Sequence, residues 1–244
     1  MKQLLLVLLT ALSLSTTADE IRFLLDPDRG EPFVFSAASD KTGLVIDIGS
    51  ALATRLNLKA MFISLPRKRH ESFITGGKID AVCLLSPSWY ATRDQLAWSK
   101  NVYSGYDVFV TAKPDKKSIV SYGDLAGKAI GTRAGYFYAE PIMQLFETGK
   151  ADRVDLQTYT SRYQLLDMGR IATFIDSEQA SYYQMTALGG KARYTHQDFK
   201  AEEYPQACAL NKGFADKVGM DAFNKAIDDL IGSGMLQNIL QRYR

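Results

Sequence analysis

Histidine and cysteine are both scarce in this chain of 244 residues, which has two of each. His70 and His196 are far apart in the sequence, so they do not form the closely spaced pair typical of protein metal sites. The sequence also has no GxSxG elbow, no phosphate-binding loop and no paired-cysteine motif. We therefore predict no metal, no cofactor and no catalytic residues. Serines are plentiful, so composition alone does not exclude a set of serine, histidine and aspartate.

An excess of charge of one sign is absent as well. The chain has 29 basic and 27 acidic residues, a formal net charge of +2. A surface that binds nucleic acid or an anionic membrane usually needs a clear positive excess. We therefore predict no nucleic-acid partner, and any charge that matters for function must be local.

Long apolar runs are limited to one, at the start of the chain. Lys2 precedes the apolar run Leu4–Leu14, and Thr16 and Ala18 are small residues before a predicted cut at Asp19. This order is typical of a secretory signal peptide. The alternative, a membrane anchor, is disfavoured because the run is too short for a hydrocarbon core of about 30 Å. We predict a signal peptide over residues 1–18 and a soluble mature protein in a bacterial periplasm.

The two cysteines, Cys83 and Cys208, both lie in apolar runs that read as strands, AVCLL and QACAL. In an oxidising compartment an even number of cysteines permits a disulfide. Two buried free thiols are the alternative, and the sequence does not decide between them. Neither cysteine is near the predicted cut, so a lipid anchor is not indicated.

The mature sequence alternates short apolar runs with amphipathic stretches, which predicts an α/β protein with strands joined by helical crossovers. Two such sets are separated by extended segments near 104–114 and 204–211. We predict two lobes, with lobe 1 formed by residues 19–107 and 208–244 and lobe 2 inserted as residues 108–207. Open α/β sheets bind ligands at the carboxyl ends of their strands, so a ligand is expected between the lobes.

Several motifs follow one another in a fixed order along the mature chain. They are EPFVF (Glu31–Phe35), GLVIDIGSALATRL (Gly43–Leu56), GGKIDA (Gly76–Ala81), TRDQLAWSKNVY (Thr92–Tyr103), DLAGKAIGTRAG (Asp124–Gly135), GRIATFID (Gly169–Asp176) and the closing IDDLIGSGMLQNILQRY. Behind a signal peptide, this order resembles the family 3 extracellular solute-binding proteins, which deliver polar amino acids to ABC importers. The resemblance implies a two-lobed type II periplasmic-binding fold that closes on its ligand by a hinge.

The resemblance also implies two anchors of opposite charge. In amino-acid-binding relatives, an arginine at the position of Arg93 grips the ligand carboxylate, a task suited to the planar fork of a guanidinium. Asp176, at the end of ATFID, matches the carboxylate that pairs with the ligand amine. An N-cap for the following helix is the alternative for Asp176. The segment before Arg93 reads SPSWYAT, which departs from the family pattern by an inserted residue. Ser86 or Ser88 could supply the hydroxyl contact, and Ser88 is our candidate.

Further candidates change the character of the predicted pocket. Arg133 falls where relatives place a polar or basic cleft residue, and Gly135 and Tyr136 follow in a turn where small hydroxyl residues are usual. Arg67 takes a position commonly held by an aromatic ring and begins a basic cluster, RKR. Trp89 is a candidate wall of the pocket, with core packing as the alternative for it and for Phe137. A pocket with several arginines favours an anionic or multi-carboxylate ligand.

We therefore predict a solute-binding protein that takes a small polar ligand bearing a carboxylate. The expected partners are this small molecule and an inner-membrane ABC permease, with the protein itself a monomer. Two alternatives remain open at this point: an enzyme resembling cyclohexadienyl dehydratase, and a module that presents its ligand to a membrane sensor.

Overall fold

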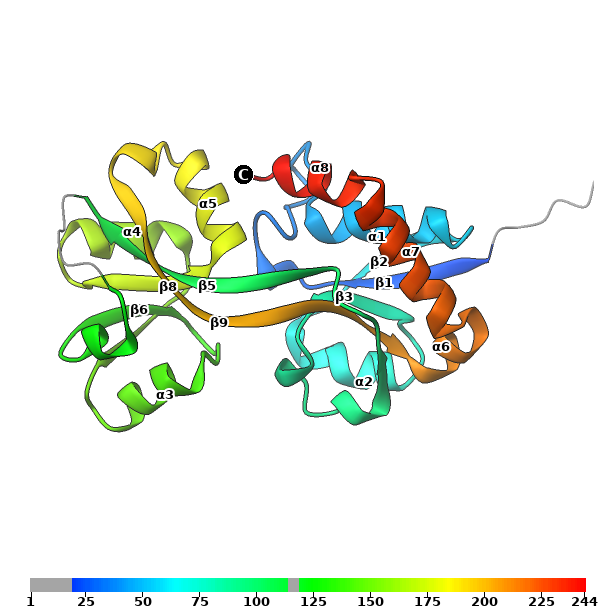
Figure 1. Ribbon diagram of the computed structural model, residues 1–244, viewed down its shortest axis with the longest axis horizontal. Coiled ribbons are helices and arrows are strands. Elements are labelled where there is room, and N and C mark those ends of the chain that lie inside the picture. The colour runs from blue at the N-terminus through cyan, green and yellow to red at the C-terminus, as the bar shows by residue number, and fades with distance from the viewer. Residues whose placement is uncertain (1–18, 114–118) are drawn as a thin grey trace, which may run out of the picture.

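The computed structural model describes residues 19–113 and 119–244, and the signal-peptide prediction for residues 1–18 lies outside them. Figure 1 shows an elongated molecule in which two α/β lobes lie side by side and two long strands run between them. Within the described residues no helix is long and apolar enough to cross a membrane.

Lobe 1 contains both ends of the described chain. Its strand β1 pairs in parallel with β2 and β3, while β3 and β4 pair antiparallel with β9. Helices α1, α7 and α8 cover one face of this sheet and α2 covers the other (Figure 1). The bounds are β1 Glu20–Leu25, α1 Leu44–Arg55, β2 Lys59–Ser64, α2 His70–Thr75, β3 Ala81–Leu85, β4 Leu96–Trp98, α6 Lys212–Val218, α7 Met220–Gly232 and α8 Met235–Gln241.

Lobe 2 repeats the same plan. Its strand β6 pairs in parallel with β7 and β8, and β8 pairs antiparallel with β5. Separate apolar clusters fill the two sides of this sheet. The bounds are β6 Ala129–Arg133, α3 Glu140–Glu147, β7 Asp152–Leu156, α4 Tyr159–Asp167, β8 Thr173–Ser177 and α5 Glu178–Ala187.

Two strands, β5 (Tyr103–Ala112) and β9 (Tyr194–Asn211), join the lobes. They pair antiparallel from Tyr103 with Gln206 to Ala112 with Tyr194, and complete the strand order β2-β1-β3-β9-β5-β8-β6-β7. The sequence predicted extended segments here, but β9 begins about ten residues earlier than expected. The sheet is consequently more mixed than the mainly parallel arrangement that the alternation suggested. The predicted lobe boundaries fall inside these strands and stay a prediction.

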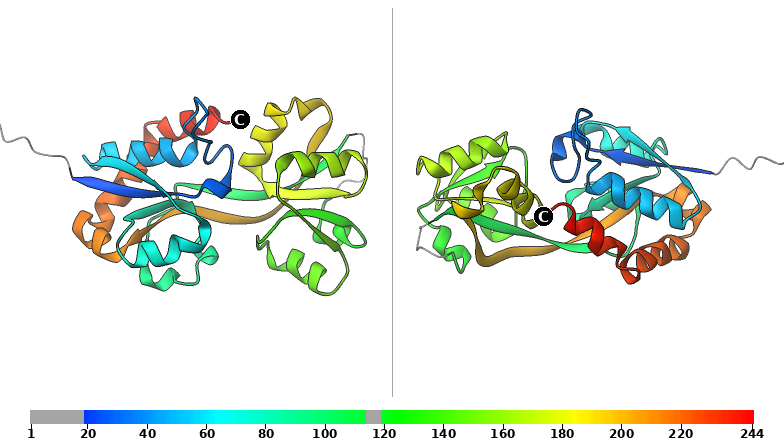
Figure 2. Two further views of the ribbon diagram at one scale, coloured as in Figure 1. Left: turned by 180° about the vertical axis from the view of Figure 1, so that it is seen from behind. Right: turned by 90° about the horizontal axis from the view of Figure 1, so that it is seen from above.

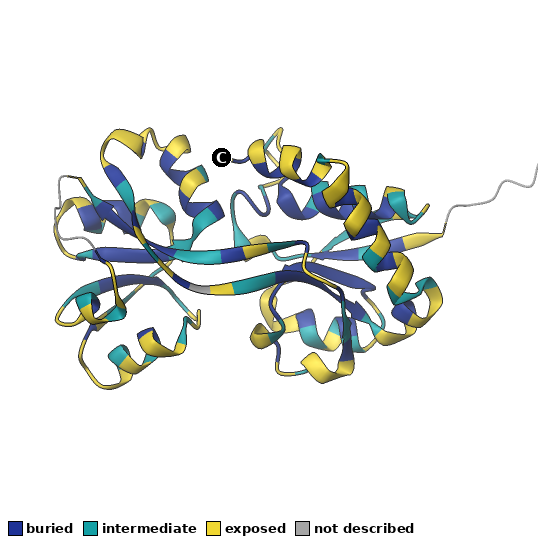
Figure 3. Ribbon diagram, in the orientation of Figure 1, coloured by how far each residue is buried: buried dark blue, intermediate teal, exposed yellow. Residues whose placement is uncertain are grey.

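Burial follows the two-lobed plan. Inner strands such as β3 and β6 are largely buried, the edge strands β2 and β7 are partly exposed, and the helices expose their outer faces, as Figure 3 shows. The views in Figure 2 show the segment after β1 lying between the lobes, on the side away from the linking strands. Residues in this segment can therefore contact both lobes.

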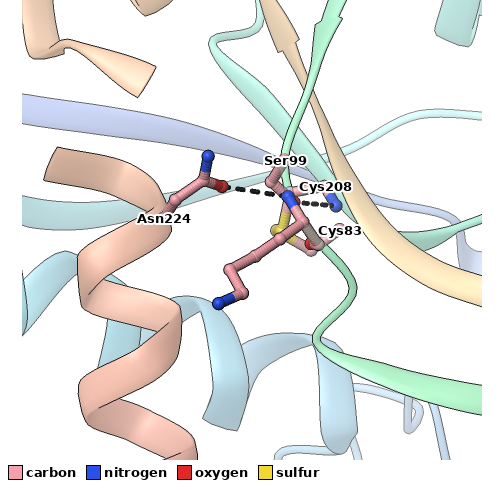
Figure 4. Close-up of a disulfide and its surroundings, with 5 residues drawn as sticks. Cys83, Ser99, Cys208 and Asn224 are labelled. Carbon is pink, nitrogen blue, oxygen red and sulfur yellow. Dashed lines mark hydrogen bonds between the residues drawn. A yellow bond between two sulfur atoms is a disulfide. The ribbon is translucent and has the colours of Figure 1, made fainter. Parts of the chain in front are cut away.

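The two cysteines form a disulfide in lobe 1. Cys83 on β3 lies directly opposite Cys208 on β9, and their sulfur atoms are joined (Figure 4). The amide of Cys208 donates to Ser99 Oγ at 2.9 Å, which holds the segment after β4 close to the disulfide. The sequence left open either a disulfide or two buried free thiols, and in the structure the two cysteines are bonded. Because the bridge spans 125 residues of sequence, it encloses all of lobe 2 in a covalent loop.

Candidate functional site

The carboxyl ends of the parallel strands of both lobes meet at the space between them. In lobe 1, β1 leads into the short 3-10 helix Pro27–Arg29, and β3 leads into another, Pro87–Trp89. In lobe 2, β6 ends at Arg133 and β8 at Ser177. This is the place where open α/β sheets hold ligands.

A hydrogen bond from an arginine crosses directly between the lobes at this place. The Arg133 guanidinium donates through Nη1 to the carbonyl oxygen of Arg29 at 3.0 Å. The Arg29 guanidinium lies over the Phe33 ring at 4.0 Å and reaches Gln206 Oε1 at 3.4 Å. Arg29 therefore contacts lobe 2 through its backbone and β9 through its side chain.

The lobe 1 wall is built around Arg67. Its Nη2 donates to the carbonyl of Trp89 at 2.7 Å, and its guanidinium lies 4.3 Å from the centre of the Tyr90 ring. His70 is buried behind it, with Nδ1 3.2 Å from the Tyr90 hydroxyl. Burial lowers the pKa of His70, the Leu65 carbonyl and Asp26 act against this, and the positive charges of Arg67 and Arg29 lower it further. This wall thus has a cationic surface over a neutral imidazole.

Arg93 and Ser88 lie on the same lobe. Arg93 is exposed, and within residues 19–113 and 119–244 nothing forms a hydrogen bond or ion pair with its guanidinium. Its carbonyl accepts a hydrogen bond from the Trp98 indole at 3.0 Å. Ser88 Oγ lies 2.9 Å from Ser86 Oγ. The roles of Arg93 and Ser88 as ligand contacts stay predictions.

Asp176 forms a buried ion pair on the lobe 2 wall. Its Oδ2 lies 2.6 Å from Nη1 of Arg162, and the two side chains are 12% and 2% exposed. The Arg162 guanidinium also lies 4.7 Å from the centre of the Tyr159 ring. Burial opposes the charge on Arg162, but Asp176 and nearby tyrosines raise its pKa overall. The charge of Asp176 is therefore already balanced inside the protein.

The helix-capping alternative for Asp176 is wrong. The N-cap of α5 is Ser177, whose hydroxyl accepts from the amide of Ala180 at 3.4 Å. Asp176 Oδ1 instead accepts from the Ser177 amide at 2.8 Å. A serine at this position caps the helix and leaves the aspartate free to face Arg162.

The turn after β6 carries the remaining lobe 2 candidates. Arg133 lies 4.6 Å from the centre of the Tyr136 ring, and its own amide donates to the Tyr138 hydroxyl at 2.8 Å. Gly135, with a φ of 76°, makes the turn that allows this fold-back. Phe137 is 81% exposed, so the alternative that it packs in the core is wrong.

The linking strands form the floor of the cleft, where an acidic side chain lies. Asp107 on β5 accepts a hydrogen bond from the Tyr204 hydroxyl of β9 at 3.2 Å. Tyr204 in turn packs against Trp89, with 5.2 Å between the ring centres. Burial, reinforced by Asp176, raises the pKa of Asp107 to about 7, although the Tyr204 hydrogen bond acts against this. At neutral pH this carboxyl is therefore near the midpoint of its titration.

The floor of the cleft also contains a close contact at a glycine, an unpartnered hydroxyl and a neighbouring cavity. Gly105 pairs with Tyr204, and a side chain at Gly105 would collide with the Tyr204 ring. The buried Tyr103 hydroxyl has no hydrogen-bond partner among the described residues. A cavity of about 130 Å³ borders the floor and is lined from both lobes, by Phe33 and Ser177 among others. A larger cavity, about 400 Å³, lies at the far end of lobe 1 and includes none of the cleft residues.

The arginines of the cleft differ in their partners. Arg162 has a carboxylate partner, as do Arg22, Arg153, Arg193 and Arg242 elsewhere. Within the described part of the chain, Arg29, Arg67 and Arg133 have none and use only neutral acceptors and aromatic rings. A guanidinium has five donors, so each of the three keeps donors for a further partner.

Sequence reasoning missed four residues of this site, namely Arg29, Asp107, Arg162 and Tyr204. Two of them carried a usable signal. Arg29 lies in the short segment that follows the carboxyl end of the first strand, and Asp107 is a charged residue inside an apolar strand pattern, YSGYDVFVTA. Arg162 and Tyr204 carried none, because their importance depends on partners 14 and 97 residues away.

The described residues hold no cluster of three or more histidine, cysteine or acidic side chains able to bind a metal ion.

A sequence model of the bacterial extracellular solute-binding proteins, family 3, matches residues 21–244. No curated protein sequence matches the chain significantly.

Solved structures with the same fold are numerous. An ancestral arginine-binding protein bound to arginine is 20% identical, with a TM-score of 0.70 over 92% of this chain and 97% of its own. An amino acid ABC transporter substrate-binding protein, AbpA from Streptococcus pneumoniae, bound to L-arginine, gives 20% and 0.70 over 92% and 94%. The ancestral amino acid-binding protein AncCDT-1, a precursor of cyclohexadienyl dehydratase, gives 19% and 0.70 over 92% and 95%. At these identities the likeness establishes the two-lobed fold alone.

Proposed function

The chain belongs to the bacterial extracellular solute-binding proteins of family 3, and we propose that it binds a small polar solute bearing a carboxylate between its lobes. An amino acid or a related organic acid fits this description. The predicted fold and family are both confirmed, whereas the nature of the ligand is the proposal developed here.

The observation that carries the proposal is the set of unpaired guanidiniums. Arg29 and Arg67 from lobe 1 and Arg133 from lobe 2 lack a carboxylate partner among the described residues, whereas Arg22, Arg153, Arg162, Arg193 and Arg242 each have one. A ligand carboxylate would complete these groups with charge-assisted hydrogen bonds, which are about twice as strong as neutral ones.

Closure of the lobes is the expected mechanism. Arg133 already reaches Arg29 across the cleft, so a carboxylate held by both would add attraction between the lobes. The linking strands β5 and β9 are where a hinge motion would take place. Water leaving the closed cleft would strengthen each of these contacts.

A thermal-shift screen tests the binding proposal. Amino acids, dicarboxylates and related acids are added to the purified protein, and a ligand at a hundred times its Kd should stabilise it by about 2.7 kcal/mol. Arg133→Ala and Arg67→Ala should each weaken binding about tenfold or more, since each removes a charged partner. Arg170→Ala, an exposed arginine before β8 at the other end of that strand, is the matched control.

Two results would decide against the proposal. One is a screen in which no carboxylate raises the Tm. The other is a carboxylate whose Kd is the same in wild type, Arg133→Ala and Arg67→Ala. The family-derived role of Arg93 is tested by Arg93→Ala in the same titration, where we expect a loss of affinity as well.

We also propose that the protein acts in the periplasm as a monomer and delivers its ligand to an ABC permease. The family and the substrate-binding neighbours support this setting. Expression of the full chain in a Gram-negative host should yield a periplasmic product that begins at Asp19 by mass spectrometry. A product retaining Met1 in the membrane fraction would contradict the setting.

A binding role is proposed in preference to catalysis, and two observations favour catalysis instead. AncCDT-1 is described as a precursor of a dehydratase, and Asp107 is an acid that retains protons at neutral pH. Incubation with prephenate and arogenate, followed by absorbance of aromatic products, separates the two. Turnover abolished by Asp107→Asn would establish the enzyme instead.

A further inference from the structure

We propose that Asp107, rather than Asp176, accepts the cationic group of the ligand, so that the ligand is an amino acid and not a simple carboxylic acid. The inference rests on the carboxylate-binding function proposed above. It adds a specificity-determining residue on a linking strand, where the sequence pointed to Asp176 on lobe 2.

Asp176 is less suited to this task than Asp107, because Arg162 already balances its charge. Both of its oxygens are engaged, Oδ2 by Arg162 at 2.6 Å and Oδ1 by the Ser177 amide at 2.8 Å. Arg162 is 2% exposed and packs on Tyr159, so breaking the pair would leave a buried charge without a partner. A ligand amine at Asp176 would have to compete with this internal cation at close range.

Asp107 has the opposite surroundings. Its one hydrogen bond among the described residues comes from the Tyr204 hydroxyl, and no arginine or lysine forms an ion pair with it. The groups that face it are Asp176 from β8, Tyr204 from β9 and Tyr138 from the segment after β6. None of these is a cation, so the carboxyl is left to keep a proton or to accept a positive group from outside.

The floor around Asp107 is arranged to present this carboxyl. Tyr204 is held by Trp89 on one side and has room to lie across β5 because residue 105 is glycine. Its hydroxyl then reaches Asp107 two residues further along the same face. The unpartnered hydroxyl of Tyr103 lies on this face as well, which marks the floor as incompletely satisfied without a ligand.

The charge balance of the cleft fits an amino acid. The unpaired guanidiniums Arg29, Arg67 and Arg133 offer a place for a carboxylate, and Asp107 offers one for an ammonium group. Without ligand, burial and Asp176 hold the pKa of Asp107 at about 7. An ammonium group would favour the ionised form, so binding at neutral pH should release about half a proton from this residue.

Matched pairs of compounds test the inference. L-glutamate is compared with glutarate, and L-phenylalanine with 3-phenylpropionate, alongside the other amino acids and their deaminated forms. Kd is measured by calorimetry at pH 7 in two buffers of different ionisation enthalpy, for wild type, Asp107→Asn and Asp198→Asn. Asp107→Asn keeps an oxygen for Tyr204, and Asp198 is an exposed residue of β9 that serves as the control.

We expect an amino acid to bind wild type at least about tenfold more tightly than its deaminated partner, with proton release. In Asp107→Asn the preference and the proton release should both disappear, while the deaminated acid binds as before; Asp198→Asn should match wild type. A deaminated acid that binds wild type as tightly as the amino acid would overturn this inference and leave the carboxylate-binding function standing. Retained preference in Asp107→Asn would also overturn it. If no carboxylate of either kind binds, the proposed function fails and this inference with it.

Discussion

The two walls of the cleft use the same residue type in opposite surroundings. On lobe 1, Arg67 is exposed and holds a backbone carbonyl and an aromatic ring. On lobe 2, Arg162 is buried and paired with Asp176. The first arginine keeps its charge available to a ligand, whereas the second has its charge cancelled by its neighbour. Burial and pairing, not residue type, therefore decide which arginine can act in binding.

The lobes also differ in how they are held together. Lobe 1 contains the Cys83–Cys208 disulfide, and lobe 2 contains the buried Arg162–Asp176 pair. Each of these can be removed separately by substitution, so the contribution of each to the free energy of unfolding can be measured.

The largest effect is expected from the disulfide. The double variant Cys83→Ala, Cys208→Ala should lose about 4 kcal/mol of unfolding free energy, because a long loop in the unfolded chain is no longer closed. Urea unfolding followed by circular dichroism measures this loss. Reductant should destabilise wild type and leave the double variant unchanged. Alkylation of both thiols in native, unreduced protein would show that the bridge is not formed.

Removal of the lobe 2 ion pair should have the next largest effect. Asp176→Asn leaves the Arg162 charge buried without its partner, which costs about 3 kcal/mol. The control is Asp229→Asn in lobe 1, which breaks the Lys225–Asp229 pair, whose side chains are 74% and 52% exposed. That exposed pair should contribute less than about 0.5 kcal/mol. Equal losses of stability in the two variants would remove the distinction between buried and exposed pairs.

The Asp107 carboxyl should give a pH dependence of intermediate size. Its pKa is raised in the folded state, to about 7, so the native protein holds a proton that the unfolded chain has lost. The stabilisation is complete below about pH 4 and is lost as the pH rises through 7. Unfolding measured from pH 4 to 8 should show this decline in wild type and a flatter profile in Asp107→Asn.

The smallest effect is expected at His70 in lobe 1, and with the opposite sign. Burial lowers the pKa of His70, so the unfolded chain takes up a proton more readily than the native protein. Its contribution is present above about pH 6.5 and is lost as the pH falls. His70→Gln should reduce the loss of stability between pH 7 and 5. A variant that loses stability on acidification as steeply as wild type would contradict the assignment to His70.

The fold was accessible from the sequence because hydrophobic periodicity is local. The segments Ile21–Leu25 and Lys59–Leu65 read as strands from their own residues, and they lie within a residue of β1 and β2. The stretch His70–Thr75 reads as a helix in the same way and coincides with α2. The first half of β9 was not expected, because Tyr194–Glu203 is a polar strand whose partner β5 lies far away in the sequence.

The site was accessible only in part, for a related reason. The motif positions identified Asp176 and Arg133 as cleft residues, and Arg133 does bridge the lobes. No motif shows that Arg162 neutralises Asp176, because that depends on how closely α4 and β8 pack. The same holds for Asp107, whose partner Tyr204 belongs to the other linking strand.

The amino-acid sequence by itself determined the α/β class, the two-lobed plan and the family, since these depend on periodicity and on the order of motifs along the chain. The tertiary structure decided the pairing of the cysteines, the partner of each arginine and the environment of each carboxyl. Charge and protonation in a cleft depend on distance and burial, and only the folded chain brings Asp107 and Asp176 close together, with a cation beside one and none beside the other.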